Sequence, residues 1–102
     1  MIARSDLPFG FQAAQIIHAA GESSPGNLSP GTFAIALSAR DEAHLRELAA
    51  ILEARGVDHH LIIESQAPYT GQATAIGVAP GPRNELRRHF SSMPLLGHRW
   101  QR

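Results

Sequence analysis

Apolar residues recur along the chain at two periods, one typical of helices and one of strands, and together they predict seven elements of secondary structure. A short strand over residues 2–5 comes first. A helix follows from about Gly10 to Ala20, and Gly21 is expected to end it. One side of this helix carries apolar residues at helical spacing and is expected to face the core. These residues are Ala13, Ile16, Ile17 and Ala20.

A stripe of larger and more polar side chains occupies the opposite side of this first helix. It consists of Phe11, Gln15, His18 and Glu22. Because the apolar side is expected to pack on a sheet, this stripe is expected to face away from the core. Gln15 and His18 lie one turn apart within it, which would place an amide and an imidazole side by side at the surface.

The next part of the chain predicts a loop followed by a buried strand. Residues 22–31 are dense in Gly, Pro, Ser and Asn, a composition typical of loops. Residues 32–39 are apolar without alternation, as expected of a central strand that is covered on both faces. The side chains of Ile35 and Leu37 are therefore expected to be fully buried.

A second helix, a hairpin and a third helix complete the pattern. Asp41 suits the N-terminal cap of the second helix, which Gly56 is expected to end. Strands are predicted near residues 59–63 and 72–79, and Pro82 opens the last helix. The apolar residues expected on the buried faces of these two helices are Leu45, Leu48, Ala49, Leu52, Leu86 and Phe90.

This order of elements determines the expected architecture. Helical crossovers imply parallel strand pairs, whereas the short turn over residues 65–71 predicts an antiparallel hairpin. Residues 1–102 are too few for two separate cores, which need about 100 residues each. The sequence therefore predicts a single α/β domain with three α/β/α layers around a four-stranded mixed sheet.

Composition narrows the class of protein. Hydrophobic residues make up 43% of the chain, which is ordinary for a globular protein. No apolar run approaches the roughly 18 residues of a membrane span, and no secretory signal is visible. The chain has no cysteine, which excludes disulfides and thiolate zinc sites. A cytoplasmic protein without a membrane partner is expected.

The charges are distributed unevenly, although their formal sum is zero. The chain has no lysine, so every fixed side-chain positive charge is an arginine. From residue 83 onward Glu85 is the only carboxylate beside an arginine-rich segment, whose members are Arg83, Arg87, Arg88, Arg99 and Arg102. Arginine pairs well with phosphate, so this end of the chain is a candidate polyanion contact. The alternative is a solvated helix face and a frayed tail.

Several common kinds of site are not indicated. The histidines show no spacing that would gather them on one metal ion, and the adjacent His59 and His60 point to opposite faces of a strand. Neither a GxGxxG motif nor a P-loop is present, and no GxSxG elbow marks a serine hydrolase. No metal and no cofactor is therefore expected.

One group of polar residues is brought together by the expected topology. Gln15 and His18 lie on the first helix, Glu64 ends the third strand, and the loop over residues 67–72 follows at the same edge of the sheet. Functional groups of such sheets gather on loops beyond the strand ends. His18 next to Glu64 would make a base held by a carboxylate, which suits the activation of water. The alternative is that these are ordinary surface residues.

A family resemblance adds to this interpretation. Asp6-Leu7, then Ala13-Ala14-Gln15 and His18-Ala19, resemble the opening of the peptidyl-tRNA hydrolase 2 family. Ile62-Ile63-Glu64 stands where that family has an apolar pair before Asp-Ala-Gly, and Thr74-Ala-Ile-Gly-x-x-Pro80 is similar to its last strand. The resemblance implies the same mixed sheet between helices, commonly as a homodimer. It also implies tRNA as a partner.

The resemblance, together with the expected topology, gives a candidate site for the hydrolysis of peptidyl-tRNA. The residues expected to carry catalysis are His18, Glu64, Gln15 and Thr70. Those expected to bind the substrate are Phe9, Gly10, Phe11, Tyr69, Gln72, Thr74, Arg87 and Arg88. The chain departs from the family in four respects: Phe9 and Phe11 replace its lysines, Glu64 replaces its aspartate, the segment over residues 64–77 is shorter, and the loop after the first helix is unusual, with the helix expected to end early at Gly21.

Two main functions follow from these observations. The first is an esterase that acts on peptidyl-tRNA or a smaller acyl ester, in which His18 and Glu64 activate water and neutral donors replace the lysines. The second is a non-catalytic module of the same fold, which binds a small ligand or a protein through Phe9, Phe11 and Tyr69. A purely structural partner domain is a third alternative. A basic surface around His18 would favour the enzyme, and an apolar surface would favour the module.

Overall fold

Four strands pair side by side in the order β2-β1-β4-β3 in the computed structural model, which describes residues 1–97. β1 runs parallel to β2 and antiparallel to β4, and β3 and β4 form an antiparallel hairpin. This arrangement confirms the predicted mixed sheet. The strands are β1 (Ile2–Arg4), β2 (Leu37–Ala39), β3 (His59–Ile63) and β4 (Ala73–Val78).

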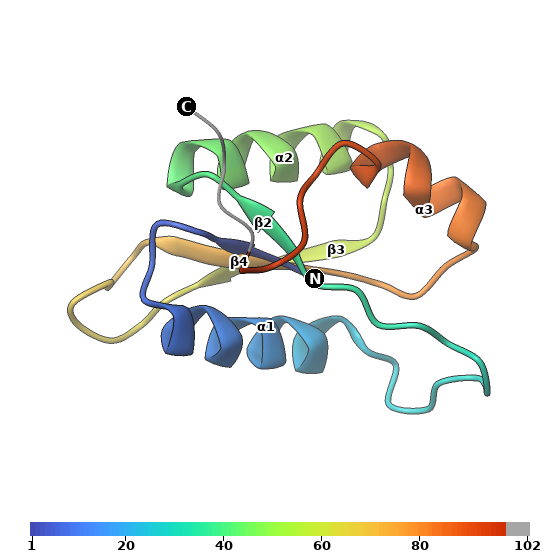
Figure 1. The fold of residues 1–102 in the computed structure, drawn as a ribbon, viewed down its shortest axis with the longest axis horizontal. Coiled ribbons are helices and arrows are strands. Elements are labelled where there is room, and N and C mark those ends of the chain that lie inside the picture. Colours follow the sequence, from blue (N-terminus) through green and yellow to red (C-terminus); the bar gives the residue numbers. More distant parts are fainter. Residues whose placement is uncertain (98–102) are drawn as a thin grey trace.

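Three helices cover the two faces of this sheet (Figure 1). α1 (Phe9–Ser23) lies on one face, and α2 (Glu42–Ala54) lies on the other with α3 (Arg83–Phe90) beside it. The side chain of Asp41 accepts the backbone N–H of His44, so the second helix begins with the predicted cap. The three-layer fold expected from the order of the elements is therefore confirmed.

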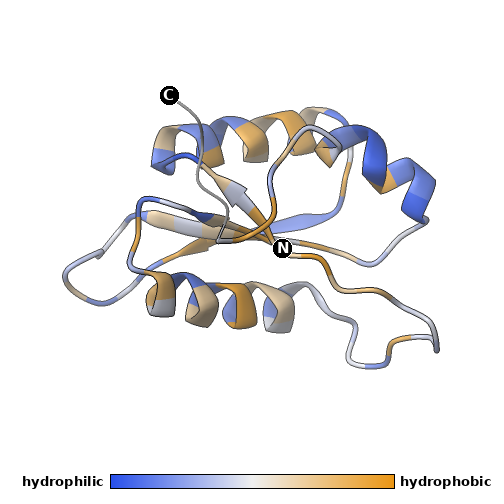
Figure 2. Cartoon of the chain, viewed as in Figure 1, coloured by the Kyte–Doolittle hydropathy of each residue, from blue (hydrophilic) through white to orange (hydrophobic). Residues whose placement is uncertain are grey.

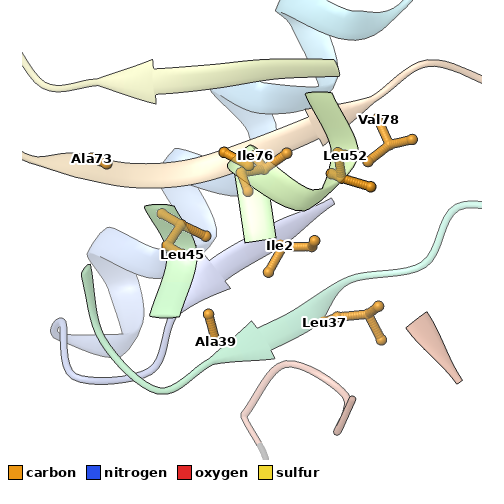
Figure 3. Packing of buried hydrophobic residues seen from close by; sticks show 9 residues of the cluster. Ile2, Leu37, Ala39, Leu45, Leu52, Ala73, Ile76 and Val78 are labelled. Atoms are coloured by element: carbon orange, nitrogen blue, oxygen red, sulfur yellow. The ribbon is translucent and has the colours of Figure 1, made fainter. Parts of the chain in front are cut away.

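The larger part of the core lies between the sheet and α2 (Figure 3). Ile2 of β1 and Ile76 of β4 meet Leu45 and Leu52 of α2, and all four side chains are almost completely buried. Leu86 and Phe90 of α3 pack against the margin of this cluster, where the sequence predicted them. The residues expected on the buried face of α2 are buried or partly buried.

The opposite face of the sheet is covered by small side chains, which lets α1 approach β4 closely. Ala3, Ala75 and Ala19 form most of this second cluster. A methyl group added at Gly77 would collide with the carbonyl oxygen of Ala19 and would lie 2.8 Å from the hydroxyl of Ser23. The backbone of α1 therefore rests directly on the backbone of β4.

The predicted orientation of α1 is wrong, and this close approach explains why. Ile17 is 73% exposed, whereas the helix buries Gln12, Gln15, Ala19 and Ser23. The buried side is rotated by about 100° from the apolar stripe. A close helix–sheet contact selects small side chains. Of the two buried glutamines, Gln15 bonds through both ends of its amide, whereas Gln12 donates to backbone carbonyls and its Oε1 atom has no partner within the described residues. Gly21 does not end the helix, which continues to Ser23.

The strand predicted over residues 32–39 is also shorter and differently placed than expected. β2 has three residues and does not lie at the centre of the sheet. Its outer side is covered by residues 94–96: the N–H of Ser38 donates to the carbonyl of Pro94, and Leu37 forms an antiparallel bridge with Leu95. Ile35 precedes the strand and is 52% exposed, so its predicted burial is wrong.

Leu37 packs in the main core at 9% exposure, as predicted, and this contrast with Ile35 gives a test. We expect Leu37→Ala to lower the free energy of unfolding by about 2–4 kcal/mol, because the lost side chain leaves a cavity. Ile35→Ala is the matched control and should change it by no more than about 0.5 kcal/mol. Chemical denaturation of both variants measures the difference. Equal losses would contradict the placement of the two side chains.

Candidate active site

The side chain of Gln15 connects α1 to the hairpin beneath it. Its Oε1 atom accepts the hydroxyl proton of Thr74 at 2.7 Å, and its Nε2 atom donates to Oε2 of Glu64 at 3.2 Å. Gln15 is 5% exposed and Thr74 is fully buried. Because the Glu64 carboxylate can only accept, it requires the Nε2 end of the Gln15 amide, and this leaves Oε1 to accept from the Thr74 hydroxyl. Three residues that the sequence placed in one site are thus joined by hydrogen bonds.

The carboxylate of Glu64 is held from two sides. Besides the amide of Gln15, the backbone N–H groups of Ser65 and Gln66 donate to its Oε1 atom at 2.8 and 3.2 Å. Glu64 is only partly buried. A carboxylate offers about four acceptor positions, so three donors leave about one for a water molecule or a substrate group. The carboxylate is therefore both fixed and reachable.

The loop that follows β3 is a tight turn closed on Glu64. The backbone of Glu64 exchanges hydrogen bonds with Gly71 and Gln72, and Gly71 adopts a φ of 81°, which favours glycine. Thr70 is exposed and forms no hydrogen bond with the rest of the described chain. The backbone N–H groups of Gly71 and Gln72 donate to the carbonyls of Glu64 and Tyr69 and cannot bind a substrate. The N–H and hydroxyl of Thr70 remain as possible donors.

Phe11 and Tyr69 extend the site with an aromatic pair. Their ring centroids lie 4.9 Å apart, so α1 and the turn after β3 meet through these two rings. Phe11 follows the same stripe of α1 as Gln15. Phe9 points to a different side, because residues two apart are separated by about 200° around a helix. It lies next to Gly97, where an added methyl group would be 3.5 Å from its ring.

His18 lies one turn after Gln15 and is exposed. Its Nε2 atom is 3.8 Å from Oε1 of Glu22, the residue one turn further along the helix. Within residues 1–97 no hydrogen bond joins His18 to Glu64. The structure therefore gives His18 a carboxylate neighbour other than the one that the sequence suggested.

A family comparison agrees with this geometry. The model of the family Peptidyl-tRNA hydrolase PTH2 matches residues 1–96 of the 102-residue chain. The chain belongs to this family. At the level of the family, the match supports a peptidyl-tRNA hydrolase-like function and a role in translation. No curated protein matches the chain.

In this peptidyl-tRNA hydrolase 2 family member, the Asp-Leu motif supports a buried arginine that the sequence analysis missed. Arg4 of β1 is 7% exposed and forms a two-pronged ion pair with Asp6 at 2.9 and 2.8 Å. It also donates to the side chain of Gln72 at 2.8 Å and to the carbonyl of Ala73 at 3.1 Å. The hydrogen bond to Asp6 raises the pKa of Arg4. Gln72, expected to bind substrate, is thus committed to Arg4.

A second charged pair holds the start of β4 from α2. Glu42 of α2 accepts the N–H of Ala73 at 2.8 Å and the Nε of Arg46 at 3.1 Å. The backbone hydrogen bond from Ala73, followed by the contact with Arg46, lowers the pKa of Glu42. The strand that carries Thr74 is therefore fixed by ion pairs on the α2 face and by Gln15 on the α1 face.

The remaining residues of the predicted site lie apart. Gly10 is exposed in the first turn of α1, and Arg87 and Arg88 lie on α3, across the sheet from α1 (Figure 1). Arg99 and Arg102 fall outside the described residues. Residues 1–97 contain no group of three or more side chains suited to a metal ion. No described helix is both long and apolar enough to cross a membrane.

Proposed function

We propose that this chain hydrolyses the ester that joins a peptide to the terminal ribose of tRNA. The observation that carries the proposal is the carboxylate of Glu64, which three donors hold in place while about one acceptor position remains. A fixed carboxylate with spare accepting capacity can orient a water molecule for attack on a carbonyl carbon. Family membership supplies the chemical class of the substrate.

In the proposed reaction, Glu64 and His18 act on one water molecule and do not need a direct hydrogen bond to each other. Water held by Glu64 attacks the ester carbonyl, and the imidazole of His18 takes its proton. The N–H and hydroxyl of Thr70 donate to the oxyanion that develops. When the bond between the carbonyl carbon and the ribose oxygen breaks, the proton passes to that oxygen. Gln15 keeps Glu64 in position and does not touch the substrate.

The aromatic pair is proposed to hold the end of the tRNA. Phe11 and Tyr69 offer ring surface where α1 meets the turn after β3, and bases stack on such rings without the need for a lysine. The proposal also includes a homodimer in the cytoplasm that needs no cofactor.

Release of the peptide from purified peptidyl-tRNA tests this function. We expect the wild-type chain to release it well above the rate in buffer. Phe11→Leu should raise KM about tenfold and leave kcat nearly unchanged, since stacking on a base contributes about 1–3 kcal/mol. Ile17→Leu, on the exposed side of the same helix, is the matched control and should change neither constant. A folded wild-type chain that releases no peptide would contradict the proposal.

A second candidate function is supported by the exposed side of α1. One stripe of this side consists of the uncharged residues Gly10, Ala14, Ile17 and Gly21, whereas His18 and Glu22 are exposed beside it. The stripe gives the surface near His18 an apolar character, which favours a non-catalytic module that binds a protein partner. The two functions differ in the hydrolysis assay, because the module releases no peptide.

A further inference from the structure

α3 presents three arginines that have no carboxylate partner among residues 1–97. Arg83, Arg87 and Arg88 are exposed, and none of them forms an ion pair within this range. Elsewhere in the chain Arg4 and Arg46 are matched to Asp6 and Glu42. α3 is accordingly the most hydrophilic of the three helices (Figure 2). An arginine face without internal counter-charges attracts anions.

The three arginines face one open hollow. It has a volume of about 690 Å³ and is lined by Arg83, Asn84, Arg87, Arg88 and Ser91, with no carboxylate among them. Arg83 and Arg87 are one turn apart, about 6 Å along the helix axis, so each can meet a different phosphate. An arginine side chain can donate two parallel hydrogen bonds to one phosphate. A series of arginines can therefore bind successive phosphates of a nucleic-acid strand.

A flat aromatic ring stands next to this arginine face. The ring of Phe33, in the loop between α1 and β2, is 78% exposed, and the guanidinium carbon of Arg83 lies 5.8 Å from its centroid. Such exposure is costly for a phenyl ring that serves only packing. A ring of this kind beside arginines is the combination that binds single-stranded nucleic acid, in which a base stacks while the phosphates meet positive charge.

We propose that Arg83, Arg87 and Arg88, together with Phe33, form a binding surface for a single-stranded RNA segment, separate from the ester-cleaving site. The arginines lie on α3, on the α2 face of the sheet, and Phe33 reaches them from the loop between α1 and β2, whereas Gln15 lies on α1, on the opposite face (Figure 1). It therefore contacts RNA away from the scissile ester. The choice of RNA over other polyanions rests on the proposed function, but the binding does not depend on hydrolysis.

Fluorescence anisotropy with a labelled single-stranded oligoribonucleotide of about 12 nucleotides, at several salt concentrations, tests the surface. This probe carries no ester, so its binding is measured independently of hydrolysis. Each phosphate neutralised on a single strand contributes about 0.7 to the slope of log affinity against log salt. Arg87→Gln/Arg88→Gln should lower that slope by about 1.4 and weaken binding about tenfold at low salt.

Two controls distinguish binding at this surface from a general effect of the protein's net charge. Arg40→Gln/Arg46→Gln removes the same charge elsewhere and should weaken binding no more than about twofold. Phe33→Leu keeps the charge and apolar bulk but removes the flat ring, so it should weaken binding about tenfold with the slope unchanged. Equal losses in the two arginine variants would overturn the proposal. So would wild-type affinity in Phe33→Leu, or stronger binding to phosphatidylserine vesicles than to RNA.

Discussion

Gly77→Ala is expected to lower the free energy of unfolding by about 3 kcal/mol or more, the upper end of the range for overpacking. The added methyl group would collide with the backbone carbonyl of Ala19, which cannot move without lifting α1 from the sheet. The same shift would separate Gln15 from Thr74 and Glu64. Chemical denaturation measures the free energy of unfolding, and the rate of peptide release should fall in the same variant.

Gly21→Ala is the matched control, because Gly21 lies on the exposed side of α1, away from the contact with β4. Gly21 lies inside α1 with open space around it, so a methyl group meets nothing within 4 Å. Alanine loses less backbone freedom on folding, and this variant should gain about 0.5–1 kcal/mol. A Gly77→Ala protein as stable as the Gly21→Ala protein would show that α1 and β4 do not touch as described.

Glu64→Gln is expected to reduce the rate of peptidyl-tRNA hydrolysis about 100-fold or more. The amide must turn its NH₂ group toward one of three donors that now point at the carboxylate, so the group loses both its charge and its orientation. His18→Ala should cause a loss of similar size if the imidazole takes the proton. Single-turnover release of peptide measures both.

The control for these variants is Glu47→Gln, which removes an exposed carboxylate from α2 and should leave the rate unchanged. Thr74→Ser keeps the hydroxyl that orients Gln15 and should retain most of the activity, whereas Thr74→Val leaves the Gln15 carbonyl without its donor. Full activity in His18→Ala would remove this residue from the mechanism. Full activity in Glu64→Gln would remove the proposed water site altogether.

The sheet and its layers were predictable because they depend on the order of elements, whereas the packing of α1 was not. Ile16 and Ile17 suggested a face that is rotated from the buried one, since apolar periodicity assumes that the largest apolar groups are buried. Here Gly77 and Ala75 of β4 make a shallow surface, and a helix that approaches it closely must present small or internally bonded groups. That requirement is set by β4, a strand distant in sequence from α1.

The same reasoning applies to the site. The sequence singled out Gln15, Glu64 and Thr74, and the structure joins them, because a motif on α1 and the ends of a hairpin must meet in this topology. The burial of Arg4 could not be predicted from the sequence, because a single arginine in a short apolar strand produces no periodic pattern. Its partner Asp6 looked like part of a family motif, and only the fold shows that its side chain serves Arg4.

The position of β1 has a consequence for synthesis on the ribosome. β1 is made before the other strands, yet it lies between β2 and β4, and its pairing partners in β4 are Ala75 and Ile76. At about 5–20 residues per second, one side of β1 stays without its partner for roughly 4–15 seconds of translation. During that time only β2 can pair with it. A parallel β1–α1–β2 unit is therefore the structure that the nascent chain must hold until the hairpin arrives.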